Sequence, residues 1–346
     1  MRLTTWIVVT TMAATTAAQT IDLHLPDADP ATGACAAAPL GLTNGLAMIQ
    51  VPAGQLVGTH RLLEAIAFAA CPAQTAAWSP TEFRFFVGHV TPGTNLNFVP
   101  LVFAGGFSDL GDFRDAVLIY DSVVDGVFTW VPQPDAWAPF GPSGANGTGF
   151  VWNGLDDVAI VISATLVSGL ANLRTAPGAP LVRIGNAPTA ILQGLYLGPK
   201  LRLTFRALPN PPVAETVGVG CTASFYLPVV FTSRLPFLGE PRLTISFSIG
   251  GIFGPTPGLL FFANDTAAPT ALANLCPVHL DPVSATAFIA QGLSPIPNNG
   301  LQRWVFSVPN DPALIGATIA CQAVIDTPGS FPPDPLTTNA LRLTIR

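Results

Sequence analysis

The sequence predicts an all-β protein made of two consecutive antiparallel β-sandwich domains, of the jelly-roll or immunoglobulin-like kind. The 346-residue chain contains 35 Pro and 32 Gly, which interrupt it too often for long helices. Its apolar runs are short and end at Gly, Pro, Asn or Asp, a pattern typical of many short strands. The segment Leu-Arg-Leu-Thr occurs at both 201–204 and 341–344, so each copy is predicted to lie in the closing strand of a domain.

The first eighteen residues are expected to form a secretory signal peptide. Arg2 supplies a short positive region, residues 3–14 an apolar segment, and residues 16–18 the small side chains that precede a cleavage site before Gln19. The alternative is that this segment is a buried first strand.

The first domain is expected to cover residues 19–206. Its strands are predicted from apolar runs bounded by turn-forming residues. The run at 62–69 also has the Leu, Glu and Ala of a short helix, so a helical turn is an alternative there. The predicted strands are 46–51, 62–69, 82–90, 116–120, 127–131, 149–152, 158–165 and 201–206.

Residues 207–213 contain three prolines and are predicted to be an extended linker. The second domain is expected to cover residues 214–346. Its predicted strands are 224–230, 242–248, 259–263, 278–281, 287–291, 302–308, 318–325 and 340–346.

The charge pattern excludes some partners. The formal net charge is −6, and the 14 Lys and Arg residues are scattered, with Lys200 the only lysine. Nucleic-acid binding requires a basic patch, so no nucleic-acid partner is expected. The best candidate for a membrane span, residues 158–173, has no charge but is shorter than the ~20 residues that a transmembrane helix needs, and the β-branched residues of its first half suit a strand better. No membrane-spanning segment is therefore expected.

The chain has five cysteines, so at least one is unpaired within the monomer. Cys321 lies in an apolar run and is predicted to be a buried, unreactive thiol. The natural pairs within the two domains are then Cys35 with Cys71 and Cys221 with Cys276. Disulfides are typical of exported proteins, because they form in oxidising compartments.

Short fragments in both domains carry a resemblance. In the second domain they are Gly218-Val-Gly-Cys221, Pro236-Phe-Leu-Gly239, Cys276-Pro-Val-His-Leu280, Phe306-Ser-Val-Pro-Asn310, Leu314-Ile-Gly316, Cys321-Gln-Ala323 and Thr338-Asn-Ala-Leu341. In their order and spacing they resemble a β-sandwich module at the C-terminal ends of secreted proteins of planctomycetes and similar bacteria. The resemblance implies a disulfide between Cys221 and Cys276, whereas Cys321 departs from the family pattern.

The first domain resembles the partner module of such exported proteins. The matching stretches begin at Thr32, Ile66, Phe85 and Phe150. The resemblance implies an exported location and a β-sandwich fold, and it assigns no catalytic residue.

Several acidic residues were weighed as a calcium site. Asp109, Asp112, Asp115, Asp121 and Asp125 lie close together, and carboxylates are preferred ligands of Ca²⁺. Their spacing does not match an EF-hand or a calcium-binding repeat. A solvated loop is the main interpretation and calcium the alternative; no other cofactor is expected.

Other candidate chemistry is weak. Asp156 and Asp157 are neighbours, and neighbours in a strand or turn point to opposite sides, so they are not expected to act on one bond. The favoured interpretation is a turn pair that caps the strand beginning at Val158. Cys276 and His279 have the spacing of half a zinc site, without a second pair of ligands. His89 ends an apolar strand and is interpreted as structural. The sequence contains no nucleophile or phosphate-binding motif.

Trp130, Trp137 and Trp152 suggest a platform on which sugar rings stack. The alternative, which we favour, is that these rings fill the sandwich core.

These observations predict an exported, non-enzymatic surface or extracellular-matrix protein that acts by adhesion or assembly. Its expected partners are cell-surface or matrix components, glycans among them, or another copy of itself. The alternative is a carbohydrate-binding or carbohydrate-active accessory protein that uses exposed aromatic residues.

Overall fold

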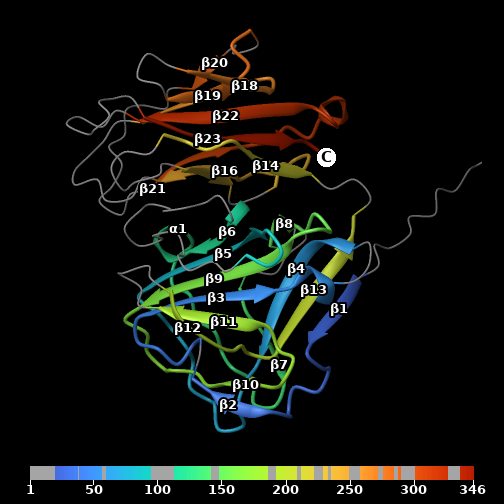
Figure 1. Cartoon of the computed structure of the whole chain (residues 1–346), viewed down its shortest axis with the longest axis vertical. Coiled ribbons are helices and arrows are strands. Elements are labelled where there is room, and N and C mark those ends of the chain that lie inside the picture. Colours follow the sequence, from blue (N-terminus) through green and yellow to red (C-terminus); the bar gives the residue numbers. More distant parts are fainter. Residues whose placement is uncertain are drawn as a thin grey trace, which may run out of the picture.

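The computed structural model describes residues 20–37, 39–56, 60–94, 113–141, 148–185, 192–208, 212–221, 229–232, 235–248, 258–271, 276–283, 287–289, 301–325 and 336–346. Helical segments in this part of the chain are short: α1 (Ser122–Asp125), η1 (Ala53–Gln55) and η2 (Pro312–Leu314). The strands form sheets that pack face to face, and nearly all pairings are antiparallel (Figure 1). The predicted all-β, sandwich-type fold is confirmed.

One sheet of the N-terminal half consists of strands from both ends of that half. Its strands are β1 (Thr20–Leu25), β13 (Leu201–Ala207), β4 (His60–Ala69) and β7 (Trp137–Pro139), with β8 (Phe150–Val151) also paired to β4. In β13 the buried residues are Leu201, Leu203 and Phe205, which is the two-residue period that the sequence predicts. These side chains face the core.

A nine-stranded sheet extends through both halves of the molecule. In spatial order it contains β12 (Leu192–Leu197), β11 (Leu181–Gly185), β3 (Gly45–Val51), β9 (Asp157–Thr165), β5 (Glu82–Val90), β6 (Phe113–Asp121), β15 (Val229–Thr232), β16 (Leu243–Ser248) and β21 (Leu301–Phe306). Strands β6 and β15 pair in parallel, with Val117 opposite Thr232. Each half therefore covers one strand edge of the other, which removes two edges open to aggregation.

The C-terminal half contributes a second large sheet. Its strands are β14 (Val213–Val217), β23 (Leu336–Thr344), β22 (Thr318–Ile325), β17 (Gly258–Ala263) and β20 (Ala287–Ile289). Two further sheets have two strands each: β10 (Leu173–Thr175) with β2 (Ala34–Ala36), and β18 (Thr266–Ala271) with β19 (Pro277–Leu280).

The buried apolar residues form two main clusters, the second of which also includes Leu62 of β4, and a small third cluster of four residues lies in the C-terminal half. The first cluster lies between the sheet that contains β1, β13 and β4 and the strands β3, β9, β5 and β6 of the nine-stranded sheet. It contains many aromatic rings. Within it Phe83 stacks on Phe128 with ring centroids 4.2 Å apart. The second contains Phe247 stacked on Trp304, with centroids 4.9 Å apart. Two cores fit two sandwiches, although the shared sheet leaves the domain limits 19–206 and 214–346 as a prediction.

Most predicted strands are present with shifted ends, and one prediction is wrong. Residues 127–131 form no strand, and the segment makes a single bridge, between Trp130 and Trp78. Pro132 and Pro134 follow directly and have no N–H to extend the pairing. The predicted strand 224–230 lies mostly outside the described residues, as do the signal peptide and part of the predicted linker.

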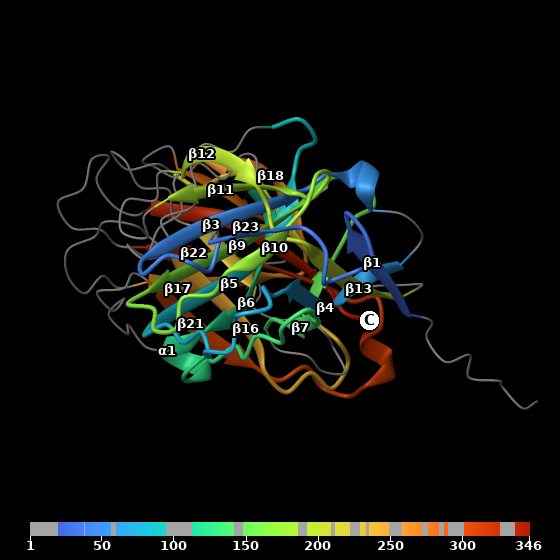
Figure 2. The same cartoon turned by 90° about the horizontal axis from the view of Figure 1, so that it is seen from below.

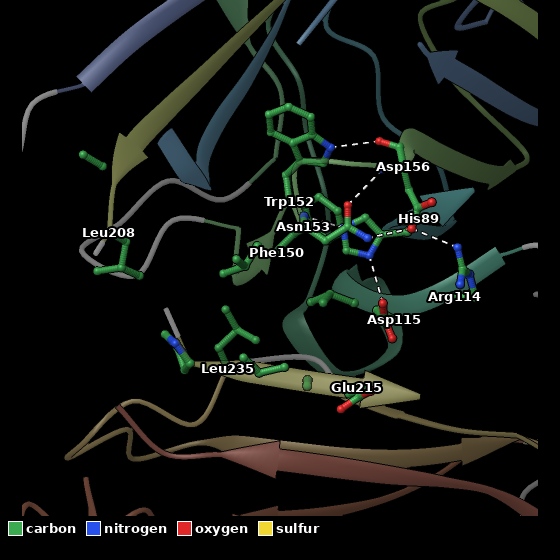
Figure 3. Close-up of a pocket in the computed structure, with 16 residues that line it drawn as sticks. His89, Arg114, Asp115, Phe150, Trp152, Asn153, Asp156, Leu208, Glu215 and Leu235 are labelled. Atoms are coloured by element: carbon green, nitrogen blue, oxygen red, sulfur yellow. Dashed lines mark hydrogen bonds and ion pairs between the residues drawn. The ribbon is translucent and has the colours of Figure 1, made fainter. Parts of the chain in front are cut away.

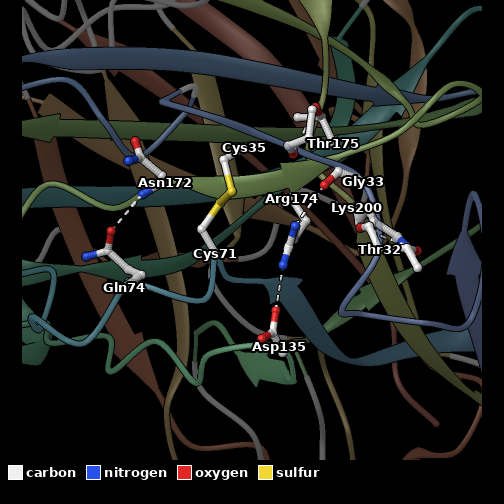
Figure 4. The surroundings of a disulfide bond; sticks show 11 residues. Thr32, Gly33, Cys35, Cys71, Gln74, Asp135, Asn172, Arg174, Thr175 and Lys200 are labelled. Carbon is white, nitrogen blue, oxygen red and sulfur yellow. Dashed lines mark hydrogen bonds and ion pairs between the residues drawn. A yellow bond between two sulfur atoms is a disulfide. The ribbon is translucent and has the colours of Figure 1, made fainter.

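Both expected disulfides are present. Cys35 bonds to Cys71 and Cys221 to Cys276, with Cα–Cα distances of 6.0 and 5.3 Å. Figure 4 shows the first of them beside Arg174, which donates hydrogen bonds to the Gly33 carbonyl and to Asp135. Each disulfide thus joins two segments that are distant in sequence, 36 residues apart in the first and 55 in the second.

Cys321 is a free thiol, fully buried in β22. Burial raises the pKa of this thiol, so it stays protonated, and only the thiolate is a strong nucleophile. We expect no reaction of the native protein with dithionitrobenzoate and one reactive thiol per chain after unfolding in guanidinium. Rapid labelling of the native protein would contradict this assignment.

Candidate functional site

The candidate site is a groove of about 900 Å³ where the two halves meet. We call it the seam groove. It is lined by His89, Arg114, Asp115, Val117, Phe150, Val151, Trp152, Asn153, Asp156, Ala207, Leu208, Pro212, Val213, Ala214, Glu215 and Leu235. Figure 3 shows His89, Arg114, Asp115 and Asp156 on one wall, with Trp152 and Phe150 beside them, and Leu208, Leu235 and Glu215 opposite.

A short turn after β8 places Asn153 and Asp156 in the groove. The sequence predicts a turn here from Asn153-Gly154, and Gly154 has the positive φ of 83° that such a turn favours. Asn153 Oδ1 accepts hydrogen bonds from the backbone N–H groups of Leu155 and Asp156, at 2.9 and 3.0 Å. The turn is therefore held by its own first side chain.

His89, near the end of β5, is only 3% exposed and uses both ring nitrogens within the protein. Its Nε2 lies 3.1 Å from the backbone N–H of Asn153, which can only donate. Nε2 is therefore the acceptor, and the proton lies on Nδ1, 3.0 Å from Asp115 Oδ2. This arrangement fits the interpretation of His89 as a structural residue.

Asp115 connects the two halves. Its backbone has a φ of +51°, which lies in the left-handed region. Its Oδ1 accepts from the backbone N–H of Thr216 on β14 at 2.8 Å, and Thr216 Oγ1 accepts from the Asp115 N–H at 3.2 Å. With His89 on its other oxygen, this carboxylate fixes β14 against β5 and β6.

Arg114 and Asp156 form an ion pair in the groove, in which the Arg114 side chain is 43% exposed and the Asp156 side chain 13%. Asp156 Oδ2 accepts from Arg114 Nη2 at 2.9 Å and from Asn153 Nδ2 at 2.6 Å. The backbone carbonyl of Asp156 accepts from Trp152 Nε1 at 2.8 Å. On the opposite wall Glu215 is half exposed and lies 3.6 Å from Arg342.

The contacts hold most of the polar groups of the groove in place. The described lining residues include no Ser, Thr, Cys, Lys or Tyr, and the ionisable side chains among them are His89, Arg114 and three carboxylates. The imidazole and two of the three carboxylates are engaged in bonds that hold the fold together. What remains is a concave surface with polar groups in fixed positions beside an apolar floor.

The three tryptophans do not form a platform, which corrects the stacking interpretation. Trp130 and Trp152 are buried in the first core, as the favoured alternative predicts. Trp137 is half buried in β7, where its Nε1 donates to the Ala28 carbonyl and its ring contacts His24. Of the three, only Trp152 lines the seam groove.

The carboxylates weighed for calcium point to different partners. Asp115 bonds to His89 and Thr216, Asp121 to two arginines, and Asp125 Oδ2 accepts from the backbone N–H of Asp121. Asp109 and Asp112 lie outside the described residues. Within the described part of the chain, no three His, Cys, Asp or Glu side chains are grouped to hold a metal ion.

Asp156 and Asp157 face opposite ways, as predicted. Asp156 lines the seam groove, whereas Asp157 is buried and accepts from Gln50 Nε2 and from the backbone N–H of Ala53, both at 2.8 Å. The half zinc site is absent too, because Cys276 is in a disulfide and His279 Nε2 lies 3.0 Å from the Val219 carbonyl.

The sequence pointed to His89, Trp152 and Asp156 singly and did not bring them together. Arg114 and Glu215 were missed, because their neighbours in the groove come from distant parts of the chain.

Neither a protein-family model nor a curated protein matches the sequence. In the described part of the chain, no helix is long and apolar enough to span a bilayer.

Proposed function

We propose that this is an exported, non-enzymatic protein that acts by adhesion or assembly at the cell surface or in the extracellular matrix. The observation that carries the proposal is the seam groove, whose polar groups are held by bonds within the protein. Concave sites with a few fixed polar groups beside apolar side chains are typical of ligand binding. A surface component that enters the groove would contact both halves at once.

The cysteines support an extracellular location. The structure has two disulfides. Disulfides persist in oxidising compartments and are rare in reducing ones. The predicted signal peptide supplies the route of export.

Carbohydrate binding is a second candidate for the same groove. Asn153, Arg114 and Glu215 offer an amide, a guanidinium and a carboxylate, which together donate and accept hydrogen bonds as sugar hydroxyls require. We therefore assign the carbohydrate alternative to the seam groove instead of to an exposed row of tryptophans.

The test is binding of the labelled protein to intact producing cells and to an array of bacterial polysaccharides. We expect the native protein in the extracellular or surface fraction, starting at Gln19. Replacing Arg114 or Glu215 with alanine is expected to weaken surface binding about tenfold, because each removes a charged hydrogen-bonding group. Arg242→Ala is the control, since Arg242 is exposed and does not line the groove.

Two results would contradict the proposal. One is a cytoplasmic protein with reduced cysteines. The other is equal surface binding by the wild type and both groove variants, with all of them folded by circular dichroism. Binding to polysaccharide spots alone would favour the carbohydrate candidate.

A further inference from the structure

The strongest unexplained surface is the hairpin formed by β11 and β12, which we call the edge hairpin. Strand β12 is the terminal strand of the nine-stranded sheet and pairs, among the described strands, with β11 alone (Figure 2). Its Leu195, Tyr196 and Leu197 are 51%, 52% and 40% exposed, and Leu181 on β11 is 47% exposed. A strand edge with free backbone groups and exposed apolar side chains is a ready site for pairing with another strand.

The register shows that the leucines share one face. Leu181 lies opposite Leu197, and Arg183 opposite Leu195. Because side chains alternate along a strand, these residues lie on the face opposite to Val182, which is buried in the core. Leu181 and Leu195 also line a second hollow, of about 420 Å³. The apolar surface thus continues from the strand edge onto the outer face of the sheet.

Among the terminal strands of the three larger sheets, β12 is the longest that has no charged side chain; β7 and β20 are also uncharged but have three residues each. Residues 192–197 include no charged side chain. By contrast, β1, β14 and β21 carry Asp22, Glu215 and Arg303. Charges on an edge strand oppose pairing with another copy of the same strand, because like charges then lie opposite each other. Only pairing that brings two uncharged edges together is free of this penalty.

We propose that the edge hairpin binds a second copy of this chain, by antiparallel pairing of β12 with β12 about a two-fold axis. An antiparallel pairing of identical strands is self-complementary, so one surface supplies both sides and the assembly closes as a dimer. With the axis at Tyr196, Leu195 of each copy lies opposite Leu197 of the other. The inference rests on the assembly part of the proposed function and names its partner.

The bulge in the hairpin limits the paired segment. The register of β11 and β12 shifts between Arg183 and Ile184, beside Gly194, whose φ is +71°. Residues 195–197 lie on one side of this shift. We therefore expect the new ladder to be centred on these three residues.

The test is sedimentation velocity of the mature chain over a range of concentrations. We expect a dimer, and we expect Tyr196→Lys and Leu195→Lys to weaken it about tenfold or more. The first places two lysines directly opposite each other, and the second places a charge against the apolar Leu197 of the other copy. Leu170→Lys is the matched control, because Leu170 is also 47% exposed and lies outside the hairpin. A monomeric wild type, or a dimer that neither hairpin variant weakens, would overturn the inference.

A second variant tests the geometry. Tyr196→Cys is expected to give a disulfide-linked dimer under mild oxidation, because opposite residues of paired strands bring their Cβ atoms close together. Leu170→Cys is expected to remain unlinked. A wild-type monomer that still binds producing cells would overturn the proposed dimer and leave the proposed adhesion in place. A dimer that binds no surface would support the pairing of β12 and contradict the proposed adhesion.

Discussion

Replacing Asp121 with alanine is expected to lower the free energy of unfolding by about 3–5 kcal/mol, the range for removing one partner of a buried ion pair. Asp121 is 1% exposed at the end of β6. Its Oδ2 accepts from Arg84 Nε on β5 at 3.1 Å and from Arg303 on β21. The carboxylate thus joins the two halves through one oxygen.

The arginines make the loss large. Burial lowers the pKa of Arg303, and the nearby carboxylate of Asp121 opposes that effect. In the alanine variant, Arg84 and Arg303 would remain close together without this carboxylate. Two buried positive charges then repel each other where water screens them poorly.

Urea unfolding at neutral pH measures this loss. The matched control is Asp135→Asn, which weakens the 2.7 Å pair with Arg174 at a site where the carboxylate is 41% exposed, and which keeps a side chain suited to the φ of +54° there. An exposed pair contributes about 0–1 kcal/mol, so the control is expected to unfold almost like the wild type. Equal losses in the two variants would show that burial of Asp121 contributes nothing beyond an ordinary surface pair.

The local parts of the fold were predictable from the sequence. Strands such as β5 and β22 have the ends that the sequence predicts, because apolar runs stop at turn-forming residues. Cysteine pairing followed from setting aside one thiol in an apolar run. Asp156 and Asp157 lie at the junction of a turn and β9, where neighbouring side chains point to opposite sides, so their separation was predictable.

The connection between the halves was not predictable in the same way. Asp115 and Thr216 are 101 residues apart in sequence, and Asp121 and Arg303 are 182 apart. Nothing near any of these residues marks its partner, because the contacts depend on which strand edges meet. The seam groove was missed for the same reason, since its walls come from strands that are far apart in sequence and meet through contacts such as the one between Asp115 and Thr216.

Some missed elements had weak local patterns. Strand β11 is short and has Leu181 exposed and Val182 buried, so its hydrophobicity suggests neither a clear alternation nor a buried run. Lys200 is different, because it is the only lysine in a chain whose other basic residues are arginine. A single lysine among arginines is visible in the sequence, but no structural role was predicted for Lys200.

Lys200 supports the second large prediction, because its side chain is completely buried. Its ammonium donates to Asp27 Oδ1 at 2.6 Å, to Thr32 Oγ1 at 2.9 Å and to the backbone carbonyl of Asp29. These acceptors belong to the segment between β1 and β2, which leads to the disulfide at Cys35 (Figure 4). One cation thus organises a loop that has no regular hydrogen bonding of its own.

Replacing Lys200 with methionine is expected to lower the free energy of unfolding by about 2–4 kcal/mol, because hydrogen bonds to a charged group contribute about 1.5–3 kcal/mol each and part of that is regained by hydration of Asp27. Arg202→Met, two residues further on, is the control. Its pair with Asp22 is long, at 4.0 Å, and half exposed, so a loss below about 1 kcal/mol is expected. Similar urea midpoints for Lys200→Met and wild type would reject the role of the buried ammonium.

The ion pair between Lys200 and Asp27 also predicts how the stability of the fold depends on pH. The hydrogen bond from Lys200 lowers the pKa of Asp27 in the folded protein. A lowered folded-state pKa stabilises the fold fully above the unfolded value of about 3.9, and this contribution disappears as the pH falls through the lowered pKa. The stability difference between wild type and Lys200→Met should therefore narrow as the pH falls from about 5 to about 2. A difference that stays constant over this range would mean that the loop carbonyls, and not the Asp27 carboxylate, hold the ammonium.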